Sequence, residues 1–512
     1  MSVDLPRFVV AAPASGHGKT TVATGLMLAL RRAGLRVSGH KVGPDYIDPG
    51  YHTLATGRPG RNLDPHLVGE DRIVPLLLHG ASADGPGSAS APGPADVAVI
   101  EGVMGLYDGH IGGDGFASTA HVSTLTSSPV ILVVDISHAS RSIAAVVLGM
   151  ATFHPDVRIA GVILNKAGSQ RHSDEVRRAL QPLGIPVLGV LHRDDDVSAP
   201  SRHLGLVPVA ERPEAARSLE HLADKIASSI DLDAVMRIAR SASPLVGAPW
   251  DARAALPGVD GGDDDNGRQP LGGALSLNGF DRARPVVAVA GGRAFTFRYT
   301  ETVELLEAAG CEVQVFDPTA DEALPAGTSG IYLGGGFPEV HAAELSANAP
   351  LRESLRSAIA EGVPTVAECA GLLYLCRTVD GAPMVGAIPA DAAMAPRLTL
   401  AYRRSTAPAD SVLAAAGTEV TGHEFHRTAV TPAAGGSGAS GASGDLGAAA
   451  PAAVAAPAWT SAAGPEGFAG PTLHASYLHT HWAGHPALAA RFATHVHHFA
   501  GATPRLQDTP TR

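Results

Sequence analysis

Short apolar runs alternate with helical patterns over the first 240 residues. Four of these runs are apolar throughout, which is typical of strands buried on both faces of a parallel sheet. They are residues 8–11, 97–100, 130–134 and 159–164. Residues 19–34 follow the first run, have apolar side chains at helical spacing and end in glycine, as many helices do. The pattern predicts a doubly wound α/β domain over residues 1–240, with ligands at the carboxyl ends of its strands.

A second domain is predicted after a break in this pattern. Residues 241–284 are rich in Gly, Pro and Asp and lack periodicity, so we interpret them as a linker. The strand–helix alternation resumes over residues 285–500 and predicts another α/β domain. Its expected elements are strands at 285–292, 312–316, 330–336 and 364–367, and helices at 300–309 and 349–359. Residues 431–465 are a low-complexity insertion, of which residues 431–458 are expected to be disordered at the surface, and residues 501–512 are a tail.

Composition narrows the class of protein. A chain of 512 residues is long enough for two domains with their own cores. A formal net charge of −12 argues against a nucleic-acid partner, which would need a basic surface. The three cysteines are too few for a disulfide framework and favour a reducing cytoplasm. No apolar run approaches the roughly 20 residues that a membrane span needs. We therefore expect a cytoplasmic protein with small-molecule partners.

The segment "AAPASGHGKTTVATG" follows a predicted strand and opens a predicted helix, as a phosphate-binding loop does. Gly16 and Gly18 allow backbone N–H groups to face an anion, Lys19 can reach the β- and γ-phosphates, and Thr20 can bind Mg²⁺. The usual pattern begins with glycine where this chain has Pro13. The alternative is a glycine-rich turn in which the lysine occurs by chance and binds no phosphate. The candidate ATP-binding residues are Ser15, Gly16, Gly18, Lys19, Thr20 and Thr21.

Acidic residues accompany this loop. Glu101 ends a buried strand, where a carboxylate can bind Mg²⁺ or its water ligands. Asp45 and Asp48 lie three apart in a Pro/Gly loop, and Asp108 follows Glu101 by seven positions. Aspartate is also a common turn residue, so these three are candidates for metal and substrate binding rather than assignments. The segment "NKAG" at 165–168, after another strand, is a weaker candidate for contact with the nucleotide base.

The segment "PTVAECAGLLYLC" predicts a strand at 364–367, a sharp turn at Cys369 and then a helix. A nucleophilic thiol needs such an elbow, backbone N–H groups for an oxyanion and a histidine base. The alternative is a buried structural thiol, which is how we interpret Cys311 and Cys376. The glycines of "YLGGGFPE" (332–339) are a candidate second side of the oxyanion pocket. The candidate bases are His474, His479, His481 and His485.

Seven segments together resemble the glutamine-dependent cobyrinic acid and hydrogenobyrinic acid a,c-diamide synthases of cobalamin biosynthesis. The similarity spans nearly the entire chain apart from the linker and the insertion, in the order of the family. The resemblance implies an N-terminal dethiobiotin-synthetase-like P-loop domain with a mostly parallel sheet, joined to a C-terminal class I glutamine amidotransferase domain. The segments are "APASGHGKTT", "KVGPDYIDPGYH", "VIEGVMGLYDG", "PSRHLGLV", "GGGFPEVHAAELSAN", "AECAGLLYL" and "ASYLHTHW".

The resemblance also implies a reaction. ATP phosphorylates a corrin carboxylate, and ammonia from glutamine converts the acyl phosphate to an amide, once at the c and once at the a side chain. The implied cofactor is Mg²⁺, the implied partners are ATP, glutamine and the corrin, and a homodimer is among the oligomeric states left open. The residues carried over by motif are Thr20, Asp45 and Glu101 for Mg²⁺, Tyr46, Asp48 and Asp108 for the corrin carboxylate, Cys369 as nucleophile and His479 as base.

Three positions depart from the pattern of the family. Ala370 replaces a glycine of the usual "AECGG" but still offers its backbone N–H. Gly292, in "AGGRAF", replaces an aspartate, and nothing in the sequence compensates for that loss. A glutamate usually follows the catalytic histidine by two residues, where this chain has His481. The third member of the triad is therefore unassigned, and His481 remains an alternative to His479.

Three other functions compete with this interpretation. Cobyric acid synthase is a related amidotransferase, but the "GPDYIDPGYH" loop argues against it. A ParA- or MinD-like ATPase with a non-catalytic C-terminal domain would need a lysine where this chain has Ala14, and it would not explain Cys369. A binding protein with an inactive glutaminase is the third. The sequence leaves open whether the corrin carries cobalt.

Overall fold

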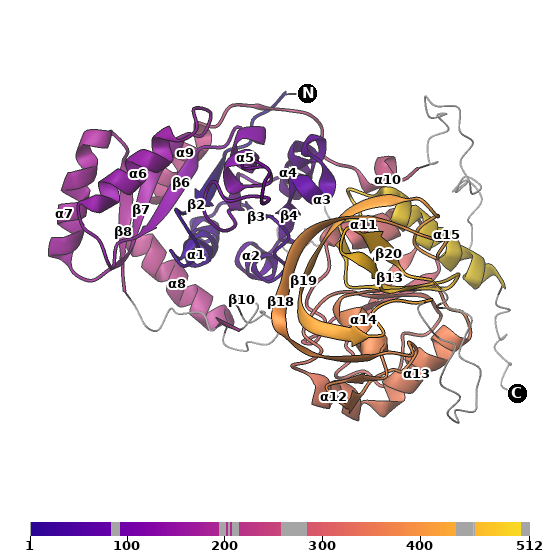
Figure 1. Cartoon of the computed structure of the whole chain (residues 1–512). Coiled ribbons are helices and arrows are strands. Elements are labelled where there is room, and N and C mark those ends of the chain that lie inside the picture. Colours follow the sequence, from indigo (N-terminus) through magenta and orange to yellow (C-terminus); the bar gives the residue numbers. More distant parts are fainter. Residues whose placement is uncertain are drawn as a thin grey trace, which may run out of the picture. The chain divides into compact units, whose positions relative to one another are not determined.

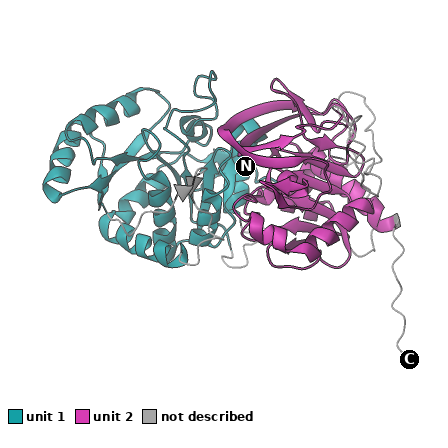
Figure 2. Ribbon diagram, turned by 60° about the horizontal axis from the view of Figure 1, so that its bottom comes forward, with its two compact units in different colours: residues 1–251 teal, residues 252–512 magenta. Residues whose placement is uncertain are grey.

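The computed structural model describes residues 2–82, 93–193, 201–202, 205–206, 215–257, 284–436, 454 and 456–502. The chain forms two compact units, Met1–Asp251 and Ala252–Arg512 (Figure 2). The division lies inside the predicted linker, of which residues 258–283 lie outside the described part. Half of the 200–207 segment, most of the predicted insertion and nearly all of the predicted tail also lie outside it.

The core of unit 1 is a seven-stranded sheet in the order β4-β3-β5-β2-β6-β7-β8, with every neighbouring pair parallel (Figure 1). The strands are β2 (Arg7–Ala11), β3 (Val37–Val42), β4 (Arg61–Leu63), β5 (Val97–Glu101), β6 (Val130–Asp135), β7 (Ile159–Ala167) and β8 (Val187–His192). Consecutive residues such as Val9 and Val10 are both fully buried, so both faces of the sheet are covered. This confirms the predicted α/β class and the four predicted strands.

Helices α1 and α8 pack together over this sheet. Gly25 of α1 approaches Leu222 and Ile226 of α8 so closely that a side chain there would overlap both. The chain leaves α1 at Gly34, whose φ of +90° is left-handed. The helices of unit 1 are α1 (Lys19–Arg32), α2 (Asp48–Thr56), α3 (Pro65–Val68), α4 (Ile73–Ala81), α5 (Thr119–Leu125), α6 (Ser142–Thr152), α7 (Gln170–Leu180), α8 (Ala215–Ser229) and α9 (Leu232–Arg240), with short 3₁₀ turns at Glu70–Arg72 and Gln181–Leu183.

Small antiparallel pairs complete unit 1. Strand β11 (Leu245–Val246) pairs with β1 (Ser2–Val3), so the first residues of the predicted linker belong to unit 1. Strands β9 (Ser201–Arg202) and β10 (Gly205–Leu206) form a second pair. In the main sheet β2 lies between β5 and β6. The connections from these central strands run to opposite sides of the sheet, and α/β sheets bind ligands at such a point. The loop after β2 lies there.

Unit 2 contains a six-stranded sheet in the order β13-β12-β14-β15-β23-β22, parallel except for the β22–β23 pair. Its strands are β12 (Val286–Ala290), β13 (Glu312–Phe316), β14 (Thr328–Leu333), β15 (Thr365–Glu368), β22 (Phe468–Ala469) and β23 (Leu473–Ser476). The helices of this unit are α10 (Ala252–Ala255), α11 (Thr300–Ala308), α12 (Ala342–Ala347), α13 (Ala349–Ala360), α14 (Ala370–Leu375) and α15 (Pro486–Ala502). The predicted strands and helices of this domain are all present.

A second, mixed sheet in unit 2 was not predicted. Its centre is the long hairpin of β18 (Asp391–Thr406) and β19 (Glu419–Thr431), drawn in orange in Figure 1. Most positions of β18 are exposed or half-buried, so the apolar pattern that predicts a buried strand is missing. The shorter strands of this sheet are β16 (Thr378–Val379), β17 (Ala382–Pro383), β20 (Trp459–Ser461), β21 (Gly464–Glu466) and β24 (His479–Thr480).

The end of the low-complexity insertion is ordered. Strands β20 and β21 form a hairpin, and β20 pairs with β18. Trp459 is 1% exposed, so its large side chain anchors the hairpin in the fold. These strands begin directly after residues 431–458, the segment expected to be disordered.

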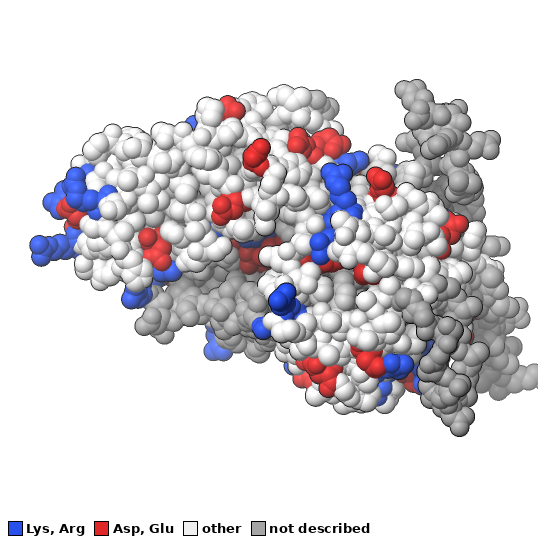
Figure 3. Space-filling view, in the orientation of Figure 1, with Lys and Arg blue, Asp and Glu red and all other residues white. Residues whose placement is uncertain are grey.

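No described helix is both long enough and apolar enough to cross a membrane. On the face drawn in Figure 3, positive and negative side chains of the described residues are interspersed.

The close contact of α14 with β14 can be tested by adding one methyl group. A Cβ on Gly371 would lie 2.7 Å from Cβ of Leu333, well inside van der Waals contact. We expect Gly371→Ala to lower the free energy of unfolding of unit 2 by about 1–3 kcal/mol. Urea titrations followed by tryptophan fluorescence measure this, because Trp459 and Trp482 are both buried in unit 2. Gly501→Ala in α15 has open space and serves as the control; an equal loss in both variants would contradict the packing argument.

Candidate active sites

The loop between β2 and α1 has the geometry of an anion site. Gly16 and Gly18 have left-handed φ angles of +86° and +91°, and a side chain on Gly18 would overlap the amide of Asn165. Glycine is therefore required at position 18 both by conformation and by space. Ser15 and Gly16 are exposed, and Thr21 is half-buried. The first backbone N–H groups of the 14-residue helix α1 are thus available to phosphate oxygens.

The ammonium group of Lys19 lies between two segments of backbone. It donates to the carbonyl of Ala14 at 3.4 Å and to the carbonyl of Met104, in the loop after β5. Burial, together with the nearby charge of Lys41, lowers the pKa of Lys19 to about 8. Neutral carbonyls are weaker partners for an ammonium than phosphate oxygens, so bound ATP would favour the charged form.

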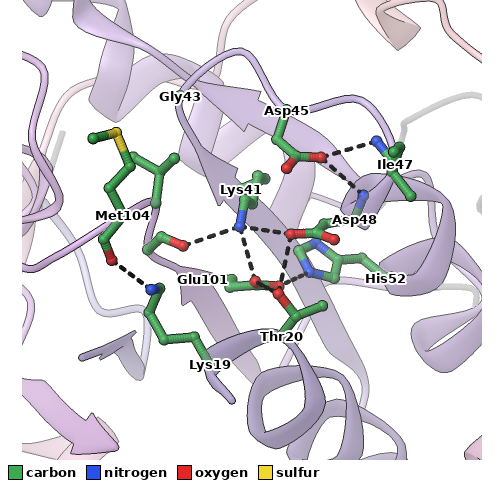
Figure 4. Close-up of polar contacts among 12 residues, drawn as sticks. Lys19, Thr20, Lys41, Gly43, Asp45, Ile47, Asp48, His52, Glu101 and Met104 are labelled. Atoms are coloured by element: carbon green, nitrogen blue, oxygen red, sulfur yellow. Dashed lines mark hydrogen bonds and ion pairs between the residues drawn. The ribbon is translucent and has the colours of Figure 1, made fainter. Parts of the chain in front are cut away.

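Five side chains form a buried polar cluster beside Lys19 (Figure 4). The Thr20 hydroxyl lies 2.5 Å from Glu101 Oε1 and 3.2 Å from Asp48 Oδ2. The Lys41 ammonium lies 2.8 Å from Glu101 Oε1 and 2.7 Å from Asp48 Oδ2. His52 Nε2 lies 2.7 Å from Glu101 Oε2. Both carboxylates are therefore shared between a cation and a hydroxyl.

Charge in this cluster is only partly balanced. Burial acts to lower the pKa of Lys41, but the carboxylates of Asp48 and Glu101 outweigh it and raise that pKa. Burial likewise opposes ionisation of Glu101, yet Lys41 and His52 hold its pKa well below the ordinary value. The pKa of Asp48 is raised well above its ordinary value by burial and by the negative charges of Asp45 and Glu101. A further cation near Asp48 would relieve this repulsion.

Asp45 and Asp48, both candidates from the sequence, differ in their contacts. Asp45 Oδ1 accepts hydrogen bonds from the backbone N–H groups of Ile47 at 2.9 Å and Asp48 at 3.1 Å, which shapes the loop before α2. No contact that the structure describes joins Asp45 to Thr20, whereas Asp48 does contact that hydroxyl. The contact with Thr20 makes Asp48 a further candidate metal acid beside the predicted Asp45 and Glu101.

The remaining predicted residues of unit 1 line the same end of the sheet. Tyr46 is buried in the loop that precedes α2. Asp108 Oδ2 accepts a hydrogen bond from the Gly105 N–H at 2.9 Å and so braces the loop after β5. That loop is fixed to the phosphate loop, because the Leu106 N–H donates to the Ala12 carbonyl at 2.8 Å.

Lys41 and His52 were not singled out from the sequence, although both lie in the quoted "KVGPDYIDPGYH" segment. Lys41 is paired in register with Glu101 across β3 and β5, a contact between residues 60 positions apart. His52 follows Asp48 by four residues, so the two side chains share one face of α2. The helical spacing could have revealed His52, but the strand register that places Lys41 required the fold.

The oxygen donors at this site suit Mg²⁺. One hydroxyl and two carboxylates, from Thr20, Asp48 and Glu101, are the hard ligands that this ion takes together with water and substrate phosphates. Within the described ranges no group of three or more His, Cys, Asp or Glu side chains is arranged as a protein-only metal cluster.

Two side chains of the "NKAG" segment donate hydrogen bonds to backbone carbonyls of the phosphate loop. Asn165 Nδ2 donates to the His17 carbonyl at 2.9 Å, and Lys166 Nζ donates to the Gly16 carbonyl at 2.7 Å. Lys166 also pairs with Asp135 at 2.8 Å. Burial alone would raise the pKa of Asp135, but hydrogen bonds from Lys166 and Ser137 outweigh it and lower that pKa to about 2.

In unit 2, Cys369 occupies the turn between β15 and α14. Its φ of +51° and ψ of −98° are unusual for a residue with a side chain, as expected for a strained elbow. The Cys369 N–H donates to the Ser476 carbonyl at 2.7 Å, and the Gly371 N–H donates to the Gly334 carbonyl at 3.0 Å. The elbow is thus attached to the end of β23 on one side and to the glycine loop (334–336) on the other.

His479 and His481 have different surroundings. A Cβ on Gly335 would lie 2.6 Å from Cε1 of His479, so this imidazole packs directly against the glycine loop. His481 Nε2 instead lies 3.7 Å from Glu301 Oε2 of α11, and its ring stacks on Tyr299 with centroids 4.0 Å apart. The position of His479 beside the glycine loop favours it over His481 as the base.

The thiol and the imidazole are both held in their neutral forms. Burial, followed by the negative charge of Glu339, raises the pKa of Cys369 well above that of an ordinary thiol, and the Ala370 N–H only partly offsets this. Burial and the neighbouring His423 and His426 hold the pKa of His479 well below its ordinary value. Such a pair is suited to proton transfer during attack on a substrate rather than to a preformed thiolate.

The carboxylate of Asp317 lies beside Gly292, the position where the family usually has an aspartate. The backbone of Gly292 has a φ of +75°, and a side chain there would overlap the carboxylate of Asp317. Asp317, which follows β13, therefore supplies a carboxylate next to the position where the family usually has its aspartate.

Comparison with known proteins agrees with this division of groups between two domains. Residues 8–207 match the CobQ/CobB/MinD/ParA nucleotide binding domain, and residues 286–487 match the CobB/CobQ-like glutamine amidotransferase domain. A hydrogenobyrinate a,c-diamide synthase of Thermobifida fusca is 58% identical over 96% of this chain and 97% of its own length. One of Streptomyces coelicolor is 52% identical over 95% of this chain and 97% of its own.

More distant relatives carry a different substrate name. A cobyrinate a,c-diamide synthase of Dehalococcoides mccartyi is 41% identical over 83% of this chain and 86% of its own length. Both domain models match in order, and relatives at more than half identity extend over nearly the whole chain. This chain therefore belongs to the a,c-diamide synthases of cobalamin biosynthesis, a family of carbon–nitrogen ligases with a glutamine amidotransferase domain.

Proposed function

We propose that the chain uses ATP and glutamine to amidate the a and c carboxylates of a corrin precursor through acyl phosphates. The observation that carries the proposal is that each unit holds the groups for one half of this reaction. Unit 1 combines two lysines, a hydroxyl and two carboxylates at a phosphate loop. Unit 2 combines a thiol in a strained elbow with a glycine loop and an imidazole.

In the first half-reaction, an oxygen of the corrin carboxylate attacks the γ-phosphorus of ATP, and ADP leaves. The ammonium groups of Lys19 and Lys41 offset the negative charge of the transferring phosphoryl group. Bound at Thr20, Asp48 and Glu101, Mg²⁺ would neutralise further phosphate charge. Other residues of unit 1 support this step: Asp45 shapes the loop, and Tyr46 and Asp108 flank the corrin carboxylate.

In the second half-reaction, Sγ of Cys369 attacks the side-chain amide carbon of glutamine while His479 takes the thiol proton. His479 then gives this proton to the leaving nitrogen, so that ammonia and a glutamyl thioester form, and water later releases glutamate. The Ala370 N–H and the glycine loop stabilise the oxyanion. Ammonia attacks the acyl phosphate carbon, and phosphate leaves as the amide forms.

The proposed corrin is the cobalt-free one, hydrogenobyrinate, and the proposed compartment is the cytoplasm. The two relatives above half identity are named for hydrogenobyrinate, while the relative at 41% identity is named for cobyrinate. Three free thiols suit a reducing compartment.

Assays with both corrins test the proposed function. With ATP, Mg²⁺ and glutamine, we expect hydrogenobyrinate to gain two amide groups, detected by mass spectrometry, with a kcat/KM at least about 10-fold above that for cobyrinate. That ratio corresponds to about 1.4 kcal/mol in transition-state stabilisation. A chain that amidates neither corrin would contradict the function, and a preference for cobyrinate would contradict only the choice of substrate.

Replacing the thiol separates the two half-reactions. We expect Cys369→Ala to abolish amidation with glutamine while amidation with ammonium salts stays near the wild-type rate, because the thiol supplies only the nitrogen. Cys376→Ala is the matched control, since Cys376 is buried one helix further on and takes no part in either half-reaction. If a folded Cys369→Ala protein lost both activities, the division of labour would be wrong.

Neutralising the two loop aspartates separately tests which of them binds the metal. We expect Asp48→Asn to raise the Mg²⁺ concentration needed for half-maximal ATP-dependent amidation by about 10-fold or more, because a carboxylate ligand is lost. Asp45→Asn, whose oxygen contacts only loop backbone in the described structure, should change it less. Glutaminase turnover is the internal control for folding. A larger Mg²⁺ effect in Asp45→Asn would restore Asp45 as the ligand.

A further inference from the structure

Glu368 directly precedes the elbow cysteine and is buried among hydroxyl groups. Its Oε2 accepts a hydrogen bond from the Tyr332 hydroxyl at 2.9 Å. Its Oε1 accepts from the Thr480 hydroxyl at 2.7 Å and from the Thr480 N–H at 3.3 Å. The residue is 3% exposed, and no role in the reaction requires a carboxylate there. Burying a carboxyl group destabilises the folded state unless hydrogen bonds replace those it made to water.

These contacts connect three strand ends that each carry one part of the glutaminase site. Glu368 ends β15, next to the nucleophile Cys369. Tyr332 lies in β14, two residues before the start of the glycine loop at Gly334. Thr480 lies in β24, next to the base His479. The neighbours of nucleophile, oxyanion loop and base thus meet at one carboxyl group.

The position of Thr480 fixes the position of His479. Adjacent side chains of an extended strand point to opposite faces, so holding Thr480 on one face orients His479 on the other. Trp482 Nε1 donates to the Thr480 hydroxyl oxygen at 3.2 Å, which directs the single hydroxyl proton toward Glu368. The ring of Trp482 also packs edge-on against Tyr332, with centroids 5.4 Å apart.

We propose that Glu368 is a positioning residue that holds His479 and the glycine loop in register with Cys369 for attack on glutamine. The inference rests on the proposed glutaminase function of unit 2. Glu368 does not touch the reacting atoms; it acts through Thr480 and Tyr332. An ionised carboxylate can accept all three of its hydrogen bonds, whereas a neutral carboxyl or amide must use one of its polar atoms as a donor.

The electrostatics of the site agree with this geometry. Burial raises the pKa of Glu368 to about 7, although the hydrogen bonds from Thr480 and Tyr332 counteract part of the shift. Without these donors the carboxylate would be harder to keep ionised, so the network and the charge support each other. Displacement of a catalytic group by about 1 Å can cost 100-fold in rate, so a positioning role of this kind is measurable.

The experiment compares Glu368→Gln, Thr480→Val and the double variant in the full-length protein. We expect each single variant to lower the kcat for glutamine hydrolysis by about 10-fold or more, with the KM for glutamine changed less than about 3-fold. The double variant should be no slower than the slower single variant, because both changes break one connection. Amidation with ammonium salts should stay near wild type in all three.

Thr365→Val is the matched control for stability. Thr365 is buried in the same strand and loses a hydrogen bond to the Val363 carbonyl, but it contacts neither the elbow nor Thr480. Its kcat should stay near wild type even if its unfolding midpoint falls. If Glu368→Gln does not fold, the kcat of Thr480→Val alone tests the positioning role. This variant removes the hydroxyl and keeps the backbone N–H.

Two results would overturn the proposal: wild-type kcat in folded Glu368→Gln or Thr480→Val, or effects that multiply in the double variant. A KM increase at constant kcat would also overturn it, because that outcome indicates glutamine binding rather than alignment of the reacting groups. Failure of the proposed function is distinguishable from these results, because the wild-type protein would then lack glutaminase activity, or Cys369→Ala would retain that activity.

Discussion

The buried contact of Lys41 with Asp48 and Glu101 is the interaction on which the ATP site of unit 1 depends. It joins the ends of β3 and β5 to the first turn of α2, and Thr20 joins the same carboxylates to the phosphate loop. Removing one partner from a buried ion pair typically costs about 3–5 kcal/mol, because the other charge is left uncompensated. The fold therefore keeps the cation and the acids together, and the same charges are available to phosphate and Mg²⁺.

In unit 2, hydrogen bonds rather than ion pairs hold the groups of the candidate site in place. Its thiol and imidazole are neutral, so this pair itself carries no charge that must be balanced. What must be maintained is alignment, because the strained backbone at Cys369 is stable only if its surroundings hold it. Bonds to Ser476 and Gly334 hold the elbow, and Glu368 connects it to the segment that carries the base. The two units thus prepare their chemistry by different means.

Much of this arrangement could be predicted from local sequence, because strands buried on both faces and glycine-rich turns have local signatures. The strand before Lys19, the elbow at Cys369 and the linker region follow from apolar runs and turn residues. The contacts of Lys41 with Glu101 and of Glu368 with Thr480 could not be predicted this way, because each joins strand ends that lie 60 or more positions apart. Asp45 and Asp48 look equivalent in the sequence; only the fold separates the loop-shaping carboxylate from the one that meets Thr20.

The features of unit 2 that the sequence did not reveal have a common cause, the lack of a local pattern. The hairpin of β18 and β19 is largely exposed, so its residues carry no pattern that distinguishes a strand from a loop. Low complexity extends over residues 431–465, but one buried aromatic side chain, Trp459, anchors the hairpin at the end of this range. Single anchoring contacts of this kind are invisible to a composition average.

The central claim, that a carboxylate activated in unit 1 is amidated by ammonia released in unit 2, is tested most directly by following one oxygen atom. Hydrogenobyrinate labelled with ¹⁸O in its a and c carboxylates is converted with ATP and glutamine, and the released phosphate is analysed by mass spectrometry. An acyl phosphate transfers one labelled oxygen to phosphate for each amide formed. Label in AMP, or unlabelled phosphate, would contradict the account.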